Sequence, residues 1–451
     1  VVGVPETVTL TACANADCSQ LMTGSLTVNL LPADAGTWWS GSGVSGNQVT
    51  FSGGTLVVEL NRSIPGTFDI GSSPTPASVN PTRCYVGATE SCTITYPENV
   101  FVVSLPDQVS ATTSFGSVSV PVCWWGFQSR TVAVDVAAQY VSPVWTGPAV
   151  TVNGVPVPTD GGTVALDLAF DASCNAPLQV DYADAGEIGL VFTHVGSGAT
   201  SGLTVTGADN LVFYPAALSI SATNALGANL DATAATAAPV HVAAENFVLT
   251  ISALNAAGVV TRGYRPQAVD RLLVYAERTG PTVGLDGVIR VSPGGSIPTR
   301  LNPPSGPGDY VPANLSAADF VNGVFTNTAA YYTEVGLVSL YVMDLDYMGH
   351  VVSASPLDIG RFVPAGFELD AGAMVSNRVT TAGCSGSTFT YMDEQLSLSV
   401  PLKAVNAFGA VTRNYRDSFA SFAGSGFSSY AGVPGNTLGA RSGSTALSDR
   451  L

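Results

Sequence analysis

Charged side chains are scarce in this 451-residue sequence: Asp, Glu, Lys and Arg together make up 11% of it, where about a quarter is usual. Lysine occurs once, at Lys403, and the other basic residues are arginines, so the chain has no polybasic patch for an anionic membrane surface. The formal net charge is −17 and the pI is near 4.3, which opposes association with a polyanion. The composition therefore argues against nucleic acid as a partner.

Long apolar runs are also missing. No stretch reaches the roughly 18 apolar residues that a membrane-spanning helix needs. The first five residues, Val1 to Pro5, carry no basic segment ahead of an apolar run and do not form a signal peptide. We expect the second copy of the repeat described below to be cut short at the end of the chain, and the chain to be a segment of a longer secreted polypeptide.

Residues that usually carry catalysis are few and scattered. The three histidines, His194, His241 and His350, stand far apart, with no HExxH motif and no neighbouring cysteine pair that would indicate zinc. No GxSxG elbow marks a nucleophile. We predict a protein without enzymatic activity.

Two acidic pairs are the candidate cation sites: Asp344 with Asp346, and Asp393 with Glu394. Calcium takes about six to eight oxygen ligands, so either pair could supply part of a site. Neither resembles an EF-hand loop, and we favour solvated turn carboxylates over Ca²⁺. We predict no cofactor.

A repeat of about 150 residues organises the chain. The segment Phe247–Tyr264 returns 151 residues later as Leu398–Tyr415, and both copies contain the turn Asn-Ala-x-Gly followed by x-Val-Thr-Arg. Two flanking pieces recur at offsets of 150 and 149 residues: Tyr182–Gly186 as Tyr332–Gly336, and Phe213–Ile220 as Phe362–Leu369. Offsets this similar leave little room for insertions between the copies.

The repeated segment has the pattern of a β-strand. Apolar residues alternate at Phe247, Leu249 and Ile251, as in a strand with one buried face. The 48 glycines and 28 prolines are spread along the chain, as expected where many short strands each need a turn. A period near 150 residues is too long for a solenoid, whose repeats have about 20–50. We predict an all-β chain of tandem immunoglobulin-like β-sandwich domains.

We divide the chain into four such domains: residues 1–97, 98–210, 211–360 and 361–451. The third domain carries the first copy of the repeat and a long loop insertion, from Arg265 to Ala329. The fourth carries the second copy and is expected to be incomplete. There, Pro401 removes a donor from the ladder and favours an edge strand, and the Gly/Ser-rich stretch Phe422–Tyr430 is expected to be disordered or ordered by a partner.

Seven cysteines favour an oxidising compartment. Cys13 with Cys18, and Cys84 with Cys92, are close enough in sequence to close local loops, and Cys123 with Cys174 could tie two strands of one sandwich. Spacing alone leaves the connectivity open, and buried free thiols in a cytosolic protein are the alternative. Cys384 is left over, and either pairs beyond this segment or stays free.

Two pairs of adjacent tryptophans are the candidate glycan contacts: Trp38, Trp39, Trp124 and Trp125. In a strand one member of each pair faces outward, where an exposed indole can stack on a sugar ring. We favour the alternative, in which one indole fills the core and the other is covered by a loop or a neighbouring domain.

Three motifs carry a resemblance to a known family: Gly360–Pro364 (Gly-Arg-Phe-Val-Pro), the Cys384 loop before Phe389–Met392, and the turn Asn406–Tyr415. The corner Tyr182–Gly186 supports it. The sequence resembles the MshQ-like family of large exported proteins, encoded with the mannose-sensitive haemagglutinin type IV pilus system. The resemblance extends over most of the chain and implies a surface-exposed role linked to pili. It carries no catalytic or ligand residues.

We therefore predict a non-enzymatic extracellular protein of the cell surface, a stalk or adhesin module associated with a type IV pilus. Its expected partners are pilus or other surface-filament proteins, including copies of itself, and a surface glycan. Exposed edge strands, such as that near Pro401, would offer sites for intermolecular pairing. Two alternatives stay open: a self-assembling subunit of a surface filament or sheath, and a lectin that uses a tryptophan pair.

Overall fold

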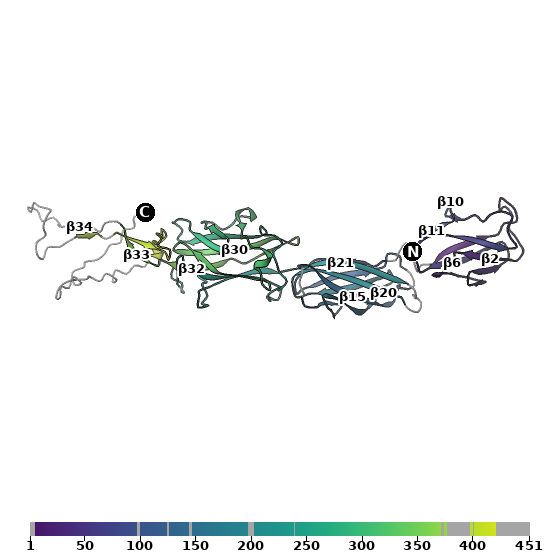
Figure 1. Ribbon diagram of the computed structural model, residues 1–451, viewed down its shortest axis with the longest axis horizontal. Coiled ribbons are helices and arrows are strands. Elements are labelled where there is room, and N and C mark those ends of the chain that lie inside the picture. Colours follow the sequence, from purple (N-terminus) through teal and green to yellow (C-terminus); the bar gives the residue numbers. More distant parts are fainter. Residues whose placement is uncertain are drawn as a thin grey trace, which may run out of the picture. The chain divides into compact units, whose positions relative to one another are not determined.

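The computed structural model describes residues 5–96, 100–123, 126–143, 147–196, 203–238, 240–370, 374–376, 397–399 and 401–420. Strands dominate this part of the chain, and its helices are 3-10 turns of three residues. Within these ranges no helix has the length and hydropathy needed to cross a membrane. The chain divides into two units, Val1–Tyr214 and Pro215–Leu451, and Figure 1 shows that strands make up both.

The first sandwich of unit 1 is built from two antiparallel sheets. One has the order β1 (Glu6–Thr11), β6 (Thr55–Arg62), β3 (Thr37–Ser40), and the other β4 (Val44–Ser45), β5 (Gln48–Phe51), β2 (Leu26–Leu31), β8 (Gly71–Thr75). Two short ribbons join β7 (Gly66–Asp69) to β11 (Thr93–Tyr96) and β9 (Tyr85–Val86) to β10 (Thr89–Glu90). Alternate residues point inward, so that Val28, Leu30, Val58 and Leu60 are buried in the core.

The second sandwich of unit 1 has two five-stranded sheets. Their orders are β12 (Val102–Ser104), β14 (Thr113–Ser119), β19 (Asn175–Asp181), β16 (Val150–Val152), β17 (Val155–Val157), and β13 (Gln108–Val109), β21 (Thr204–Tyr214), β20 (Gly186–Val195), β15 (Thr131–Ser142), β18 (Asp160–Ala169). The inner faces meet in an aliphatic and aromatic core that includes Val134, Val180 and Phe192.

The third sandwich, in unit 2, repeats this strand order. One sheet runs β22 (Ala217–Thr223), β24 (Phe247–Leu254), β29 (Val324–Tyr332), β26 (Val288–Ser292), β27 (Gly295–Pro298). The other runs β23 (His241–Val242), β32 (Leu357–Val363), β30 (Gly336–Tyr347), β25 (Leu272–Gly280), β28 (Val311–Pro312), with β31 (His350–Ser353) also paired to β30. The 3-10 turns η2 (Pro307–Asp309) and η3 (Ala317–Asp319) lie between β27 and β29.

The rest of unit 2 begins the next domain. β33 (Gly366–Leu369) pairs with β36 (Leu402–Val405), β34 (Met374–Ser376) with β35 (Ser397–Ser399), and η4 (Asp417–Phe419) ends the described part. The carbonyl of Pro401, just before β36, accepts a hydrogen bond from the amide of Asp370 at 2.9 Å. The stretch Phe422–Tyr430 lies outside the described residues.

The prediction of an all-β chain is confirmed, but the prediction of a long loop insertion between Arg265 and Ala329 is wrong. That segment contains β25 to β28 and the start of β29. β25 escaped detection because its residues from Leu272 to Ala276 are all buried, and a central strand covered on both faces shows no alternation. The boundaries drawn at residues 210 and 360 also cut strands, since β21 runs to Tyr214 and β32 to Val363.

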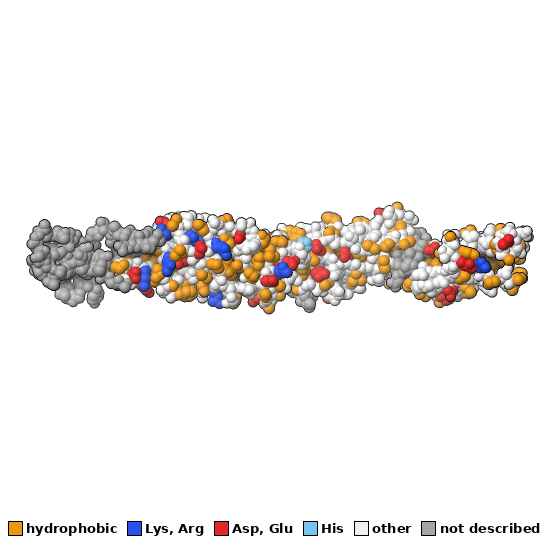
Figure 2. All heavy atoms as spheres, turned by 90° about the horizontal axis from the view of Figure 1, so that it is seen from above, with side chains coloured by type: hydrophobic (Ala, Val, Ile, Leu, Met, Phe, Trp, Pro, Cys, Tyr) orange, Lys and Arg blue, Asp and Glu red, His pale blue; other side chains and the backbone are white. Residues whose placement is uncertain are grey.

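The scarcity of charge is visible on the surface. On the face seen in Figure 2, acidic and basic side chains are scattered among neutral polar and apolar atoms. Neutral polar, backbone and apolar atoms, rather than ionic side chains, therefore cover most of this face.

Candidate functional site

The second copies of the recurring sequence pieces meet in unit 2 and form what we call the repeat junction: residues 332–336, 362–369 and 401–419. The amide of Ala365, in the linker after β32, donates to the carbonyl of Val405 at 2.8 Å. The amide of Ala407, in the turn after β36, donates back to the carbonyl of Ala243 in the third sandwich at 2.9 Å. The pieces that recur in the sequence are therefore those that join one domain to the next here.

Asn406 closes the turn after β36 with its side chain. Its Oδ1 accepts hydrogen bonds from the amides of Phe408 and Ala410, both at 3.0 Å, and its Nδ2 donates to the carbonyl of Thr333 at 2.9 Å. In the first copy of the repeat, Oδ1 of Asn255 accepts the amides at the two corresponding positions, also at 3.0 Å. One amide side chain shapes the turn and also bonds the neighbouring domain, which explains an asparagine here.

Glu334 lies in the corner between β29 and β30 and bonds the segment after the turn. Its Oε2 accepts the backbone amides of Arg413 at 2.9 Å and Asn414 at 3.2 Å. Burial raises the pKa of Glu334 above its ordinary value, and these two amides partly offset the shift. The corresponding corner residue in the first copy, Asp184, is also acidic.

Asn414 and Phe419 complete the junction. Asn414 is fully buried; its Nδ2 donates to the carbonyl of Leu285 and its Oδ1 accepts the amide of the same residue, both at 2.8 Å. Phe419 is buried against Val335 and Leu337. A side-chain clamp on the backbone and an apolar contact thus hold residues 412–419 on the end of the third sandwich.

The candidate cation site at Asp344 and Asp346 is used internally. Asp344 is fully buried and accepts the hydroxyl of Tyr264 at 2.7 Å and the amide of Asp346 at 3.1 Å. Burial raises the pKa of Asp344, and the Tyr264 bond opposes that shift. No group of three or more potential metal-ligating side chains occurs within the described ranges. Asp393 and Glu394 lie outside them.

Two of the three histidines considered for zinc, His194 and His241, bond the backbone instead. Nδ1 of His194 lies 2.8 Å from the carbonyl of Ala133, and Nε2 of His241 lies 3.2 Å from that of Glu245. Both rings are largely buried among aromatic side chains.

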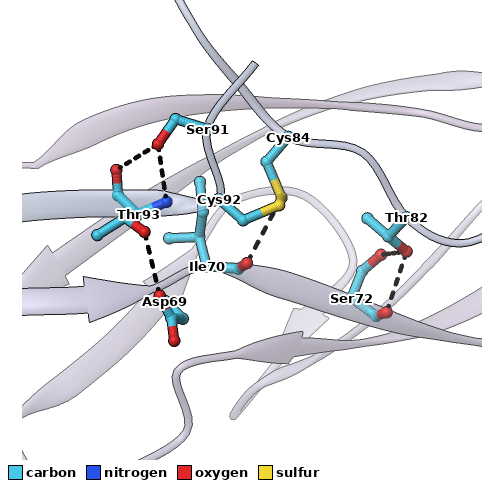
Figure 3. The surroundings of a disulfide bond; sticks show 8 residues. All are labelled: Asp69, Ile70, Ser72, Thr82, Cys84, Ser91, Cys92 and Thr93. Atoms are coloured by element: carbon cyan, nitrogen blue, oxygen red, sulfur yellow. Dashed lines mark hydrogen bonds between the residues drawn. A yellow bond between two sulfur atoms is a disulfide. The ribbon is translucent and has the colours of Figure 1, made fainter.

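Disulfides join three pairs of cysteines, those considered from their spacing: Cys13–Cys18, Cys84–Cys92 and Cys123–Cys174. Figure 3 shows the second pair, where Cys84 Sγ lies 3.5 Å from the carbonyl of Ile70. Beside it, the hydroxyls of Ser72 and Thr82 lie 3.1 Å apart and bond the loop to β8. Such bonds persist in oxidising surroundings. Cys384 lies outside the described residues.

The two tryptophans of the first candidate pair differ in exposure to solvent. Trp39 is buried, and its Nε1 donates to the carbonyl of Pro32 at 3.0 Å, so its burial rules it out as a glycan contact. Trp38 is 43% exposed on the other face of the edge strand β3. Trp124 and Trp125 lie outside the described residues.

Three family models match parts of the chain. Residues 81–208 match the first Ig-like domain of a domain of unknown function, DUF6701. The chain is thus an all-β protein with immunoglobulin-like domains, as predicted. Residues 334–450, which include most of the repeat junction, match the third domain of DUF6701, and residues 2–77 match another domain of unknown function, DUF8613. None of these descriptions names the MshQ-like family.

No curated protein matches the chain. Among solved structures, it is similar to the Escherichia coli adhesin FdeC (13% identity, 80% of this chain and 93% of that chain covered, TM-score 0.29). It is also similar to invasin, a bacterial integrin-binding protein (10%, 82% and 63%, TM-score 0.25), and to BcpA, the major pilin subunit of Bacillus cereus (10%, 79% and 95%, TM-score 0.19). At these identities and TM-scores, the likenesses carry no argument about what this chain binds.

Proposed function

We propose that this chain is a non-enzymatic segment of an extracellular bacterial surface protein, in which tandem Ig-like domains act as a structural or adhesion module. The repeat junction carries this proposal. Its contacts run from backbone to backbone and from Asn406, Glu334 and Asn414 to backbone, so one domain is held on the next at many points. A chain that must keep its domains in register under load requires such a junction.

Two further features agree with this role. The disulfides suit an oxidising compartment outside the cytoplasm. The similar solved structures include a bacterial adhesin and a pilin. Association with a type IV pilus is the finer proposal, and it rests on the resemblance to the MshQ-like family.

Immunogold electron microscopy on intact cells and sheared surface filaments tests the proposal, with an antibody raised against residues 210–451. Label at filament tips supports a pilus-borne adhesin module. Regular label along the shaft supports a structural filament subunit, the first alternative. Label confined to the cell body leaves a surface role but removes the association with pili, and label only inside cells overturns the proposal.

A second candidate function is glycan binding on the outer face of β3 and β6. Trp38 is 43% exposed on this face and is paired with Asn61, whose side chain is buried. Two positions along, the hydroxyl of Ser40 donates to the Oε2 of Glu59 at 3.2 Å. An exposed indole beside the exposed hydroxyl of Ser40 and carboxylate of Glu59 offers a sugar both a stacking surface and hydrogen-bond partners.

If this face binds a glycan, tryptophan fluorescence should change on titration, and Trp38→Ala should weaken binding about tenfold or more, equivalent to about 1.4 kcal/mol. Phe115→Ala is the matched control, because Phe115 is an aromatic side chain 70% exposed on the second sandwich. Its affinity should equal that of the wild type. A broad glycan panel without any response, or equal losses in both variants, removes this candidate.

A further inference from the structure

The longest edge strand in the described part of the chain is β18, ten residues at the border of the second sandwich. It pairs only with β15, from Ala169 opposite Thr131 to Asp160 opposite Gln139. Its sequence, Asp-Gly-Gly-Thr-Val-Ala-Leu-Asp-Leu-Ala, contains no proline, lysine or arginine, which are common devices for protecting an edge. The strand therefore offers a nearly uninterrupted row of backbone donors and acceptors.

The register shows which backbone groups are free. The amide of Phe170 donates to the carbonyl of Arg130 at 2.8 Å, so even-numbered residues turn their amides and carbonyls toward β15. The carbonyls of odd-numbered residues in β15 point away from β18 and toward β20 on the other side, as the carbonyl of Ala133 points toward His194. The odd-numbered residues Thr163, Ala165 and Asp167 thus point theirs outward. No hydrogen bond from another described residue reaches these groups.

The third sandwich protects the corresponding edge. There β25 occupies the position of β15, and its outer side is covered by residues 299–313, which form only the two-residue strand β28. The amide of Arg300 donates to the carbonyl of Ala276 at 2.9 Å, and the amide of Ala313 to that of Leu272 at 2.9 Å. This segment also carries four prolines: Pro303, Pro304, Pro307 and Pro312. The third sandwich therefore blocks this edge, whereas the second sandwich leaves it open.

We propose that β18 pairs with β18 of a second copy of this chain, antiparallel and about a two-fold axis through Ala165. A two-fold pairing uses the same edge of both copies, so it closes as a dimer and leaves no β18 edge free for further growth. The sheet that contains β18 in one copy then joins the same sheet of the second copy, and the two form one continuous sheet.

The side chains fit this register. Thr163 lies opposite Asp167 of the second copy, where its hydroxyl can donate to the carboxylate, and Val164 lies opposite Leu166. Pairing centred on Asp167 would instead place two carboxylates opposite each other. In a chain of net charge −17, the register that keeps acids apart is the one expected to form.

Sedimentation equilibrium of the whole chain tests the proposal. We expect a reversible monomer–dimer equilibrium that salt strengthens, because salt screens the repulsion between two acidic chains. Ala165→Pro removes an outward amide without touching the bonds to β15, and proline is tolerated at such an edge position. It should raise the dimer dissociation constant about tenfold or more. Ala165→Ser keeps the amide and should leave the constant unchanged.

Two charge variants test the register. Thr163→Lys faces Asp167 of the second copy and should tighten the dimer, whereas Thr163→Asp should weaken it by a similar factor. Equal shifts in both variants overturn the proposed register. A dimer that Ala165→Pro leaves intact, or a chain that is monomeric at every concentration, overturns the proposal and leaves this edge to a partner of another sequence. The immunogold result does not depend on any of these outcomes.

Discussion

Replacing Asp34 with alanine should lower the free energy of unfolding of the first sandwich by about 3 kcal/mol, because it leaves a buried guanidinium without its carboxylate. Arg62 is fully buried, and its two terminal nitrogens donate to the two oxygens of Asp34, both at 2.9 Å. Nη1 also donates to the hydroxyl of Thr37, and the guanidinium carbon lies 3.2 Å from the ring centroid of Phe68. Asp34 is half exposed, so the loss should fall at the lower end of the range of about 3–5 kcal/mol for broken buried pairs.

Denaturant unfolding monitored through the buried indole of Trp39 measures this change, since Trp39 lies on the strand that follows Asp34. Asp135→Ala removes the same charge from an exposed position and should change stability by less than about 0.5 kcal/mol. The double variant Asp34→Ala with Arg62→Met should recover much of the loss, because no buried charge remains. Equal midpoints for Asp34→Ala and Asp135→Ala would contradict the prediction.

The same ion pair sets an acid dependence. Hydrogen bonds from Arg62, and then Thr37, lower the pKa of Asp34 from 3.8 to about 2. A carboxyl with a depressed pKa stabilises the fold above its unfolded-state pKa, and this contribution is lost as the pH falls toward the folded value. The wild-type sandwich should therefore lose stability between about pH 4 and pH 2. The Asp34→Ala variant should lack that component of the loss.

The sequence alone predicted β24, whose two faces differ, and missed β25, whose two faces match. β24 alternates between buried and half-buried residues and was found directly, whereas the core of β25 is buried throughout. Alternation in sequence reports one solvated face, so a strand covered on both sides gives no signal. The ion pair of Asp34 with Arg62 could not be predicted from the sequence either. Its partners are 28 residues apart and meet only through the fold.

The repeat junction shows the same limit at the level of function. The recurrence of Asn255 as Asn406 was plain in the sequence, and both side chains close the same turn, but the hydrogen bond from Asn406 to Thr333, 73 residues away, could be found only from the fold. Asn414 could not be found at all, because the first copy has Gly263 at that position. A repeat identifies what is shared between copies, whereas this clamp belongs to the contact made by one copy.

Replacing Asn414 with alanine should release residues 402–419 from the end of the third sandwich. The substitution leaves the amide and the carbonyl of Leu285 without their partner, at a cost of about 2 kcal/mol or more. Because local opening controls exchange, amides in this segment should exchange about 30-fold faster, the factor that corresponds to 2 kcal/mol. Hydrogen exchange followed by mass spectrometry measures the change peptide by peptide.

Arg413→Ala is the matched control, since the side chain of Arg413 is exposed while its backbone amide still reaches Glu334. Exchange in residues 402–419 should stay at the wild-type rate in that variant. Asn414→Gly, which restores the residue of the first copy, should behave like the alanine variant, because neither side chain can bond Leu285. If all three variants protect the segment equally, the clamp does not hold the junction. Docking would then depend on the apolar packing of Phe419 and on the turn closed by Asn406.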